Sequence, residues 1–250
     1  MIMLKKLIWL LACFLLILQA VSCANADGNT LIMATNAAFR PYEYYDKGRI
    51  TGIDAELAEE IAKRLGKSLQ IHDMDFNSVI TSVITHKSDM AMAGITKTYE
   101  RAQAIRFTDP YVVSRQLVLV RKDGPIKHFA QINEPDAEWK IGVQESTTGD
   151  IYCTAKYGEG RVLKYKTYND AVMALEKDKV DCVVIDEAPA HTFAADMENI
   201  EILDTEMLEE EYAIAVAMDN PELQKRIDEI LNDMRTDGSL QAIIDKYIEE

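Results

Sequence analysis

The chain has little positive charge, few cysteines and no long apolar run beyond its first residues. Its 27 lysines and arginines face 42 aspartates and glutamates, which gives a formal net charge of −15. An acidic surface repels nucleic-acid phosphates and anionic lipid headgroups, so neither partner is expected. The four histidines and four cysteines show no metal-ligand spacing, and we expect neither a metal nor a cofactor.

The first 22 residues have the composition of an export signal. Lys5 and Lys6 precede an apolar run over residues 7–18, and this run of 12 residues is too short to cross a bilayer comfortably. It suits the hydrophobic region of a signal peptide, so the protein is expected outside the cytoplasm. Because Lys5 and Lys6 are the only charged side chains of this segment, its removal takes the net charge to −17.

Two processing routes are open at the end of this signal. Residues 20–23 (AVSC) resemble a lipobox, in which Cys23 becomes lipidated, and we favour this route. The sequence Ala24-Asn25-Ala26 would instead allow simple cleavage after Ala26. The first route anchors the protein to the outer face of the cell membrane, and the second leaves it periplasmic or extracellular.

Two cysteines, Cys153 and Cys182, lie in the exported part of the chain. Thiols of an exported protein can join in a disulfide, and they can also serve as separate small apolar side chains. The sequence leaves both alternatives open.

From residue 31 the chain alternates apolar strand patterns with amphipathic helix patterns. One helix is predicted over residues 53–65, where Ile53, Leu57 and Ile61 recur at four-residue spacing and Gly66 marks the end. Strand patterns at 31–34, 69–74 and 90–93 enclose this helix and another after residue 77. This order predicts a mostly parallel sheet covered by helices.

The second half of the chain repeats this plan. Residues 76–91 align without gaps with residues 168–183; each block opens with an aromatic residue and Asn, and each has an Asp before its buried strand. The repeat predicts two similar α/β lobes. Their strands end at Gly94 and Asp186, and because ligands of open α/β sheets bind beyond the carboxyl ends of strands, we expect both ends to face one cleft.

Residues 89–111 carry the residue types needed to hold a carboxylate. Gly94 allows close approach to the backbone, Thr96 offers a hydroxyl donor, and Arg101 offers two parallel N–H donors. A strand end, a helix cap and a surface arginine would account for each residue separately. Their combination points to carboxylate binding.

The string AGITKTYER at 93–101, followed by FTDPY at 107–111, resembles the signature of the extracellular solute-binding proteins that deliver polar amino acids to ABC importers. The resemblance implies a periplasmic binding protein type II fold with two lobes and two hinge crossings. Lobe one would comprise residues 27–113 and 213–250. Lobe two would comprise residues 114–212, including the hinge strands, and the protein would be a monomer.

The resemblance also implies a ligand site. Arg101 would bind the α-carboxylate, Asp186 would bind the α-ammonium, and Phe39 and Phe76 would form aromatic walls. Asp186 could equally be a helix N-cap, or serve in both ways. The expected ligand-binding residues are Asn36, Phe39, Phe76, Ala93, Gly94, Thr96, Arg101, Gln144, Thr148, Gly149 and Asp186.

Asn36 and Gln144 would set the ligand preference. Relatives that bind basic ligands often have Asp where this chain has Asn36, so we expect a neutral polar amino acid. A basic amino acid is the alternative, which Glu145 would favour if it pointed into the cleft.

The function expected from this resemblance is capture of an extracellular amino acid, followed by delivery to an ABC transporter permease on hinge closure. A lipid on Cys23 would be the only membrane attachment. An amino-acid-sensing module for a receptor is one alternative. A cyclohexadienyl-dehydratase-like enzyme, with Glu145 and Asp186 as acid–base groups, is a weaker one, and we expect no enzymatic activity.

Overall fold

The computed structural model describes residues 29–203, 205 and 209–248. The expected signal peptide and Cys23 lie outside these residues. Within the described ranges, no helix is both long and apolar enough to cross a membrane.

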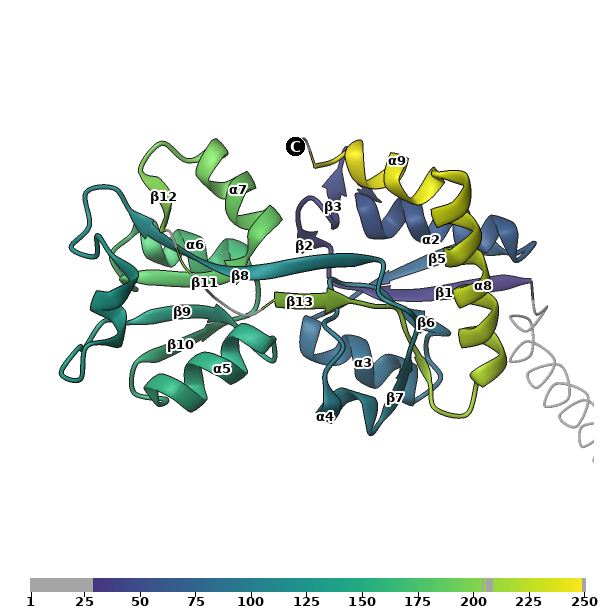
Figure 1. Ribbon diagram of the computed structural model, residues 1–250, viewed down its shortest axis with the longest axis horizontal. Coiled ribbons are helices and arrows are strands. Elements are labelled where there is room, and N and C mark those ends of the chain that lie inside the picture. Colours follow the sequence, from purple (N-terminus) through teal and green to yellow (C-terminus); the bar gives the residue numbers. More distant parts are fainter. Residues whose placement is uncertain (1–28, 204, 206–208, 249–250) are drawn as a thin grey trace, which may run out of the picture.

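Two lobes lie side by side and are joined by long strands (Figure 1). The sheet of the first lobe has the strand order β5 (Ser68–Asp73), β1 (Thr30–Thr35), β6 (Met90–Ala91), β14 (Ala215–Ala217) and β7 (Ile105–Phe107). Strands β5, β1 and β6 are parallel, whereas β14 runs antiparallel to both of its neighbours.

The sheet of the second lobe has a similar plan. Its order is β10 (Val162–Tyr165), β9 (Ile141–Gln144), β11 (Cys182–Asp186), β8 (Val112–Arg121) and β12 (Ile200–Leu203), and β13 (Glu209–Tyr212) also pairs with β8. Strands β10, β9 and β11 are parallel, and β8 is antiparallel to its partners. The two-lobed α/β fold is therefore confirmed, with mixed rather than mostly parallel sheets.

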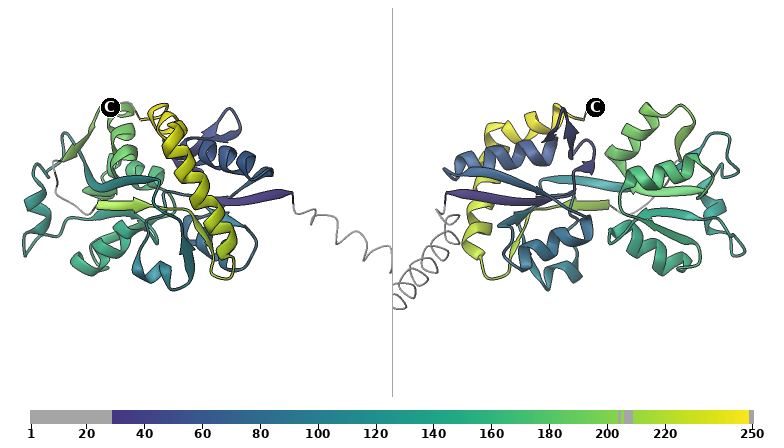
Figure 2. Two further views of the ribbon diagram at one scale, coloured as in Figure 1. Left: turned by 45° about the vertical axis from the view of Figure 1, so that its right-hand side comes forward. Right: turned by 180° about the vertical axis from the view of Figure 1, so that it is seen from behind.

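The sheets are mixed because the chain passes between the lobes on antiparallel strands. Strands β8 and β13 pair with each other and lie together between the lobes in both views (Figures 1 and 2). The second crossing between the lobes is divided into β13 and β14. We propose the lobe boundaries 27–113 plus 213–250 and 114–212 on the strength of this arrangement.

Helices cover both sheets. They are α2 (Ile53–Arg64), α3 (Phe76–Ile84), α4 (Tyr99–Ala102), α5 (Thr148–Tyr157), α6 (Tyr168–Glu176), α7 (Glu187–Asp196), α8 (Pro221–Asp237) and α9 (Ser239–Asp245), with a 3-10 turn at Phe129–Asn133. In Figure 1, α2 and α9 lie on one side of the first sheet and α3 on the other. The predicted inward face of α2 is confirmed, since Ile53, Leu57 and Ile61 are fully buried.

The segment between β1 and α2 forms a small antiparallel sheet. It contains β2 (Ala38–Phe39), β3 (Glu43–Asp46) and β4 (Arg49–Thr51). The turn at Lys47-Gly48 has positive φ at both positions, 49° and 80°, as a tight two-residue hairpin requires. In the same small sheet, the pairing of β2 with β3 sets Phe39 opposite Glu43, and both side chains are buried.

Cys153 and Cys182 are free thiols in the structure. Both are buried in the apolar core of the second lobe, among residues such as Val118, Ile141 and Val184. They therefore serve there as small apolar side chains, which is the second of the two alternatives.

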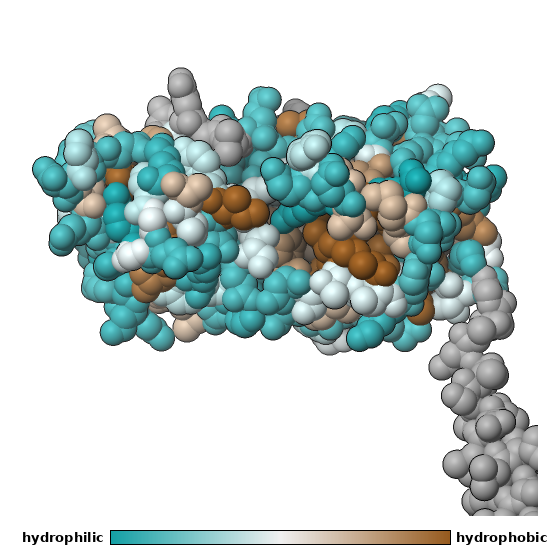
Figure 3. Space-filling model, turned by 90° about the horizontal axis from the view of Figure 1, so that it is seen from below, coloured by the Kyte–Doolittle hydropathy of each residue, from teal (hydrophilic) through white to brown (hydrophobic). Residues whose placement is uncertain are grey.

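The face of the molecule seen from below is largely hydrophilic, with apolar side chains gathered in a few limited patches (Figure 3). This agrees with the strongly acidic composition of the chain.

Replacing Gly52 by Ala should destabilise the protein strongly. Gly52 has φ 121°, and a Cβ there would lie 2.6 Å from the carbonyl oxygen of Pro41 and closer still to that of Tyr42. Left-handed strain and overpacking together should cost more than about 3 kcal/mol. Gly48→Ala is the matched control because Gly48 also has positive φ, 80°, but has open space around it. Denaturant unfolding should show a cost of about 1 kcal/mol for the control; equal losses would contradict the steric argument.

Candidate functional site

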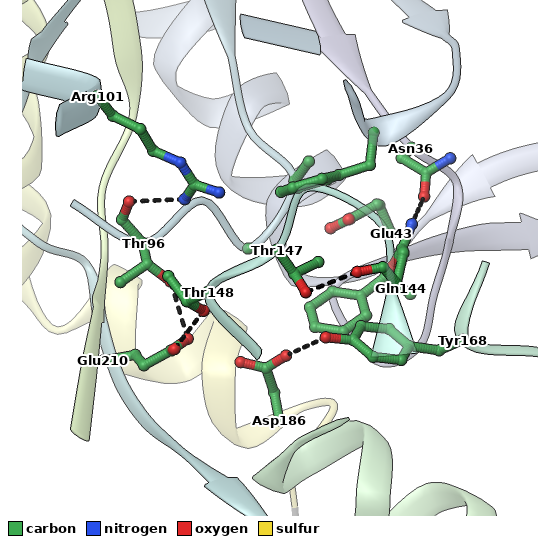
Figure 4. A pocket seen from close by; sticks show the side chains of 14 residues that line it. Asn36, Glu43, Thr96, Arg101, Gln144, Thr147, Thr148, Tyr168, Asp186 and Glu210 are labelled. Atoms are coloured by element: carbon green, nitrogen blue, oxygen red, sulfur yellow. Dashed lines mark hydrogen bonds between the residues drawn. The ribbon is translucent and has the colours of Figure 1, made fainter. Parts of the chain in front are cut away.

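A pocket lies between the two lobes, where the strand ends of both sheets meet. Its enclosed space is about 20 Å³, little more than one water molecule needs. The lobes are thus nearly closed on each other, and a ligand requires them to open. The pocket is lined by Asn36, Phe39, Glu43, Phe76, Ala93, Gly94, Thr96, Arg101, Gln144, Thr147, Thr148, Tyr168, Asp186 and Glu210 (Figure 4).

The expected ligand-binding residues therefore line the pocket, with the exception of Gly149. A Cβ at Gly149 would lie 3.1 Å from Gln116 Oε1, so this glycine leaves room for the Gln116 side chain. Gln116 in turn donates to Asp186 over 2.9 Å. Gly149 thus supports the pocket wall from behind, and the binding roles of the other residues stay predictions.

Arg101, at the end of the short helix α4, connects the two lobes. Its Nη1 donates to the carbonyl of Thr96 over 2.8 Å, and its Nη2 donates to the carbonyl of Ser146 over 3.1 Å. Its guanidinium carbon lies 5.7 Å from the centre of the Phe76 ring. Burial lowers the pKa of Arg101, and attraction to Glu210 and Asp186 opposes that shift. Arg101 brings the only positive charge among the residues that line the pocket.

Asp186 lies at the end of β11, on the opposite side of the pocket. It occupies the N-cap position of α7, but its side chain makes no capping bond. Its carboxylate instead accepts from Tyr212 Oη at 2.6 Å, Gln116 Nε2 at 2.9 Å and Tyr168 Oη at 3.2 Å. Burial, followed by repulsion from Glu210, raises the pKa of Asp186 well above its usual value.

Two buried carboxylates of the pocket were not identified from the sequence. Glu210, on β13, accepts from Thr96 Oγ1 at 2.8 Å and from the hydroxyl of Thr148. Glu43, on β3, is fully buried, and neither of its oxygens has a hydrogen-bond donor among the described residues. Figure 4 shows Glu43 near Asn36 and Gln144, at the side of the pocket away from Arg101.

A further buried carboxylate, Asp54, interacts with Glu43 and affects its pKa. Asp54 accepts from Tyr111 Oη at 2.7 Å and from the Gly94 N–H at 3.1 Å. The Gly94 N–H, which we expected to face a ligand carboxylate, is thus held by Asp54. Burial first and Asp54 second raise the pKa of Glu43 well above its usual value, which favours a protonated Glu43; burial also raises the pKa of Asp54.

The two amides expected to choose the ligand bind each other. Gln144 Nε2 donates to Asn36 Oδ1 over 2.9 Å and to the Lys166 carbonyl over 2.9 Å. Asn36 Nδ2 donates to the Met74 carbonyl over 2.9 Å. Both N–H donors of Gln144 and one of Asn36 are therefore occupied by protein groups, and one of these bonds crosses between the lobes. This removes most of the basis for expecting a neutral ligand.

Glu145 does not line the pocket. Its carboxylate binds Lys166 Nζ and Asn77 Nδ2, each over 2.5 Å, at the surface between the lobes. It is thus neither a cation-selecting group for the pocket nor part of an acid–base pair with Asp186.

Aromatic rings form the apolar part of the pocket. Phe39 stacks on Tyr168, with ring centres 5.5 Å apart, and Phe76 lines the wall near Arg101. Tyr168 was missed from the sequence, although the internal repeat places it opposite Phe76, since each is the first residue of its helix. The same alignment sets Gly94 opposite Asp186.

The charges that line the pocket are unequal. Glu43, Asp186 and Glu210 face one guanidinium, that of Arg101. Buried carboxylates are costly unless a cation or a proton compensates them. The pocket is therefore suited to a ligand that brings positive charge as well as a carboxylate.

The chain matches the family model for bacterial extracellular solute-binding proteins, family 3, over residues 31–250. It is 29% identical to the arginine-binding extracellular protein ArtP of Bacillus subtilis, covering 96% of this chain and 97% of that one. It is 30% identical to a probable histidine-binding protein of Campylobacter jejuni, covering 90% and 88%. A crystal structure of the P235GK mutant of ArgBP from T. maritima superposes with a TM-score of 0.83 at 34% identity, covering 89% of this chain and 96% of that one.

Glu43→Gln should stabilise the ligand-free protein, and increasingly so as pH rises. A raised pKa means that the folded state retains the Glu43 proton to higher pH than the unfolded state, so stability falls as pH rises above about 4. Each pKa unit of this shift costs about 1.4 kcal/mol once Glu43 is forced to ionise.

Unfolding of the parent and Glu43→Gln should be compared between about pH 4 and pH 8. Asp46→Asn, at the exposed end of the same strand, is the matched control. A stability difference between parent and Glu43→Gln that did not grow with pH would show that Glu43 is already compensated in the folded protein.

Proposed function

Because the chain belongs to family 3 of the bacterial extracellular solute-binding proteins, we propose that it captures an amino acid with a positively charged side chain and delivers it to an ABC transporter permease. The observation that carries the choice of ligand is the excess of buried carboxylates. An arginine-like ligand brings two positive groups and one carboxylate, which matches three carboxylates and one guanidinium better than a neutral amino acid does.

The geometry supports a specific orientation of this ligand. Its α-carboxylate would lie between Arg101 and the hydroxyls of Thr96 and Thr148, and its α-ammonium would face Asp186. Its cationic side chain would extend toward Glu43, on the far side of the pocket (Figure 4). Aromatic faces on the way, such as Phe39, attract a cation and cover its apolar stem.

Closure of the lobes would couple binding to delivery. Several described bonds join the sides of the pocket, among them Arg101 to Ser146, Gln144 to Asn36, and Asn77 to Glu145. A ligand that touches both lobes adds contacts only in the closed form and so shifts the population toward it. The permease would recognise that form.

The arginine- and histidine-binding names of the relatives support a basic ligand in preference to the neutral one expected from Asn36. The anchor on Cys23 and the monomeric state stay part of the proposal. Membership of a family of solute-binding proteins supports a binding protein that is not an enzyme.

Glu43→Gln should change which amino acid is preferred. After unfolding and refolding to remove carried-over ligand, the parent should bind L-arginine more tightly than L-glutamine in calorimetry. The variant should lose about tenfold or more in arginine affinity, because a buried charge-assisted bond is worth about 1.5–3 kcal/mol, and it should bind glutamine much as before. A parent that preferred glutamine would restore the neutral-ligand hypothesis.

Arg101→Ala should remove most binding of any amino acid, because it leaves a buried α-carboxylate without its cation. The thermal shift caused by saturating L-arginine should then largely disappear. Arg226→Ala is the control, since Arg226 is exposed on α8 and its ion pair is with Glu229 of the same helix. Unchanged binding by Arg101→Ala would refute the assigned carboxylate site.

A further inference from the structure

We propose that Glu210 is a second carboxylate for the α-ammonium of the ligand, acting together with Asp186. This places a ligand-binding residue on the hinge strand β13 itself. The inference rests on the proposed function, amino-acid capture, and it adds a residue to that site.

The position of Glu210 sets it apart from its neighbours. On β13, Glu209 and Glu211 are exposed, whereas the alternation of the strand turns Glu210 inward, where it is only 4% exposed. A glutamate in such a place is costly and adds nothing to apolar packing. Its carboxylate also lines the same pocket as Arg101 and Asp186.

The donors that reach Glu210 carry no charge. They are the hydroxyls of Thr96, from the first lobe, and of Thr148, at the start of α5 in the second. Asp186 is in a similar position, because two tyrosine hydroxyls and an amide donate to it. Two acidic side chains are thus buried together, and the hydrogen-bond donors that reach them among the described residues are all uncharged.

Glu210 and Asp186 are close enough for their repulsion to raise the pKa of Asp186. An α-ammonium has three N–H donors and can bind both carboxylates at once. Its arrival would free the two threonine hydroxyls from Glu210, and these could then donate to the ligand α-carboxylate. The ammonium would thus replace the two threonine hydroxyls as the hydrogen-bond donor to Glu210. Both the α-ammonium and the α-carboxylate of the ligand would then have hydrogen-bond partners.

Before binding, a proton on Asp186, whose pKa is raised by burial and by Glu210, would relieve the repulsion between the two groups. The charged and titratable groups around the pair are Arg101 of α4, Tyr168 of α6, Tyr212 of β13, Glu43 of β3 and Tyr42 just before β3. When the ammonium replaces that proton, the proton leaves to solvent.

The test compares each amino acid with an analogue that lacks the α-ammonium. L-Arginine is paired with 5-guanidinopentanoic acid, and L-glutamine with 5-amino-5-oxopentanoic acid. Affinities are measured by calorimetry for the parent, Glu210→Gln and the control Glu211→Gln, which removes the same charge from the exposed face of the same strand. Glu210→Gln should lose about tenfold or more for the amino acid and little for the analogue.

A purely structural role for Glu210 would weaken the amino acid and its analogue equally, and that result would overturn this inference while leaving the proposed function intact. So would unchanged affinity of Glu210→Gln for the amino acid. Failure of the parent to bind either amino acid would overturn the proposed function, and this inference with it.

A measurement on the parent alone guards against poor folding of the variant. Calorimetry in two buffers of different ionisation enthalpy counts the protons released near neutral pH. More protons should leave with the amino acid than with its analogue, because Glu43 contributes equally to both members of a pair. Equal proton counts would contradict a proton on Asp186 in the empty pocket.

Discussion

Burial of like charges is the constraint on which this structure depends. Glu43, Asp54, Asp186 and Glu210 lie within or directly behind one pocket, with Arg101 as the single guanidinium that lines it. Such an arrangement is unfavourable in a protein that only needs to fold, because each buried carboxylate costs free energy unless it is paired. Hydroxyl and amide donors reduce this cost without removing it. The remaining cost is recovered when a ligand brings positive charge, so the same groups that weaken the free protein favour its complex.

The scaffold keeps these groups in place from several independent elements. The hairpin β2–β4 holds Glu43, the strand end after β6 positions Gly94 and Thr96, β11 ends at Asp186, and the hinge strand β13 carries Glu210. Because the two central strand ends come from different lobes, the pocket is complete only when the lobes meet. The proposed hinge motion would therefore assemble the site as well as cover it.

The fold and ten of the fourteen described residues that line the pocket could be predicted from the sequence, because they depend on local patterns, on a repeated unit and on the family signature. Apolar spacing located α2, and the alignment of 76–91 with 168–183 indicated two lobes whose strand ends meet. Three kinds of information were missing. The sequence does not show which side chains meet across the interface between the lobes, where Asn36 and Gln144 bind each other. The hairpin that buries Glu43 lies in a stretch with weak strand patterns. Glu210 sits in a run of glutamates, where only the strand pairing shows which one points inward.

The hydrogen bonds that join the lobes without any ligand have a further consequence for transport. Arg101 with Ser146 and Asn36 with Gln144 are bonds between protein groups alone, so they favour closure whether or not cargo is present. An empty carrier in the closed shape would be a false signal to a transporter and would waste ATP. Keeping the carboxylates of an empty, closed pocket buried costs free energy, either as repulsion or through the uptake of protons. A cationic ligand would remove that cost, so the acidic pocket would make the closed shape depend on cargo.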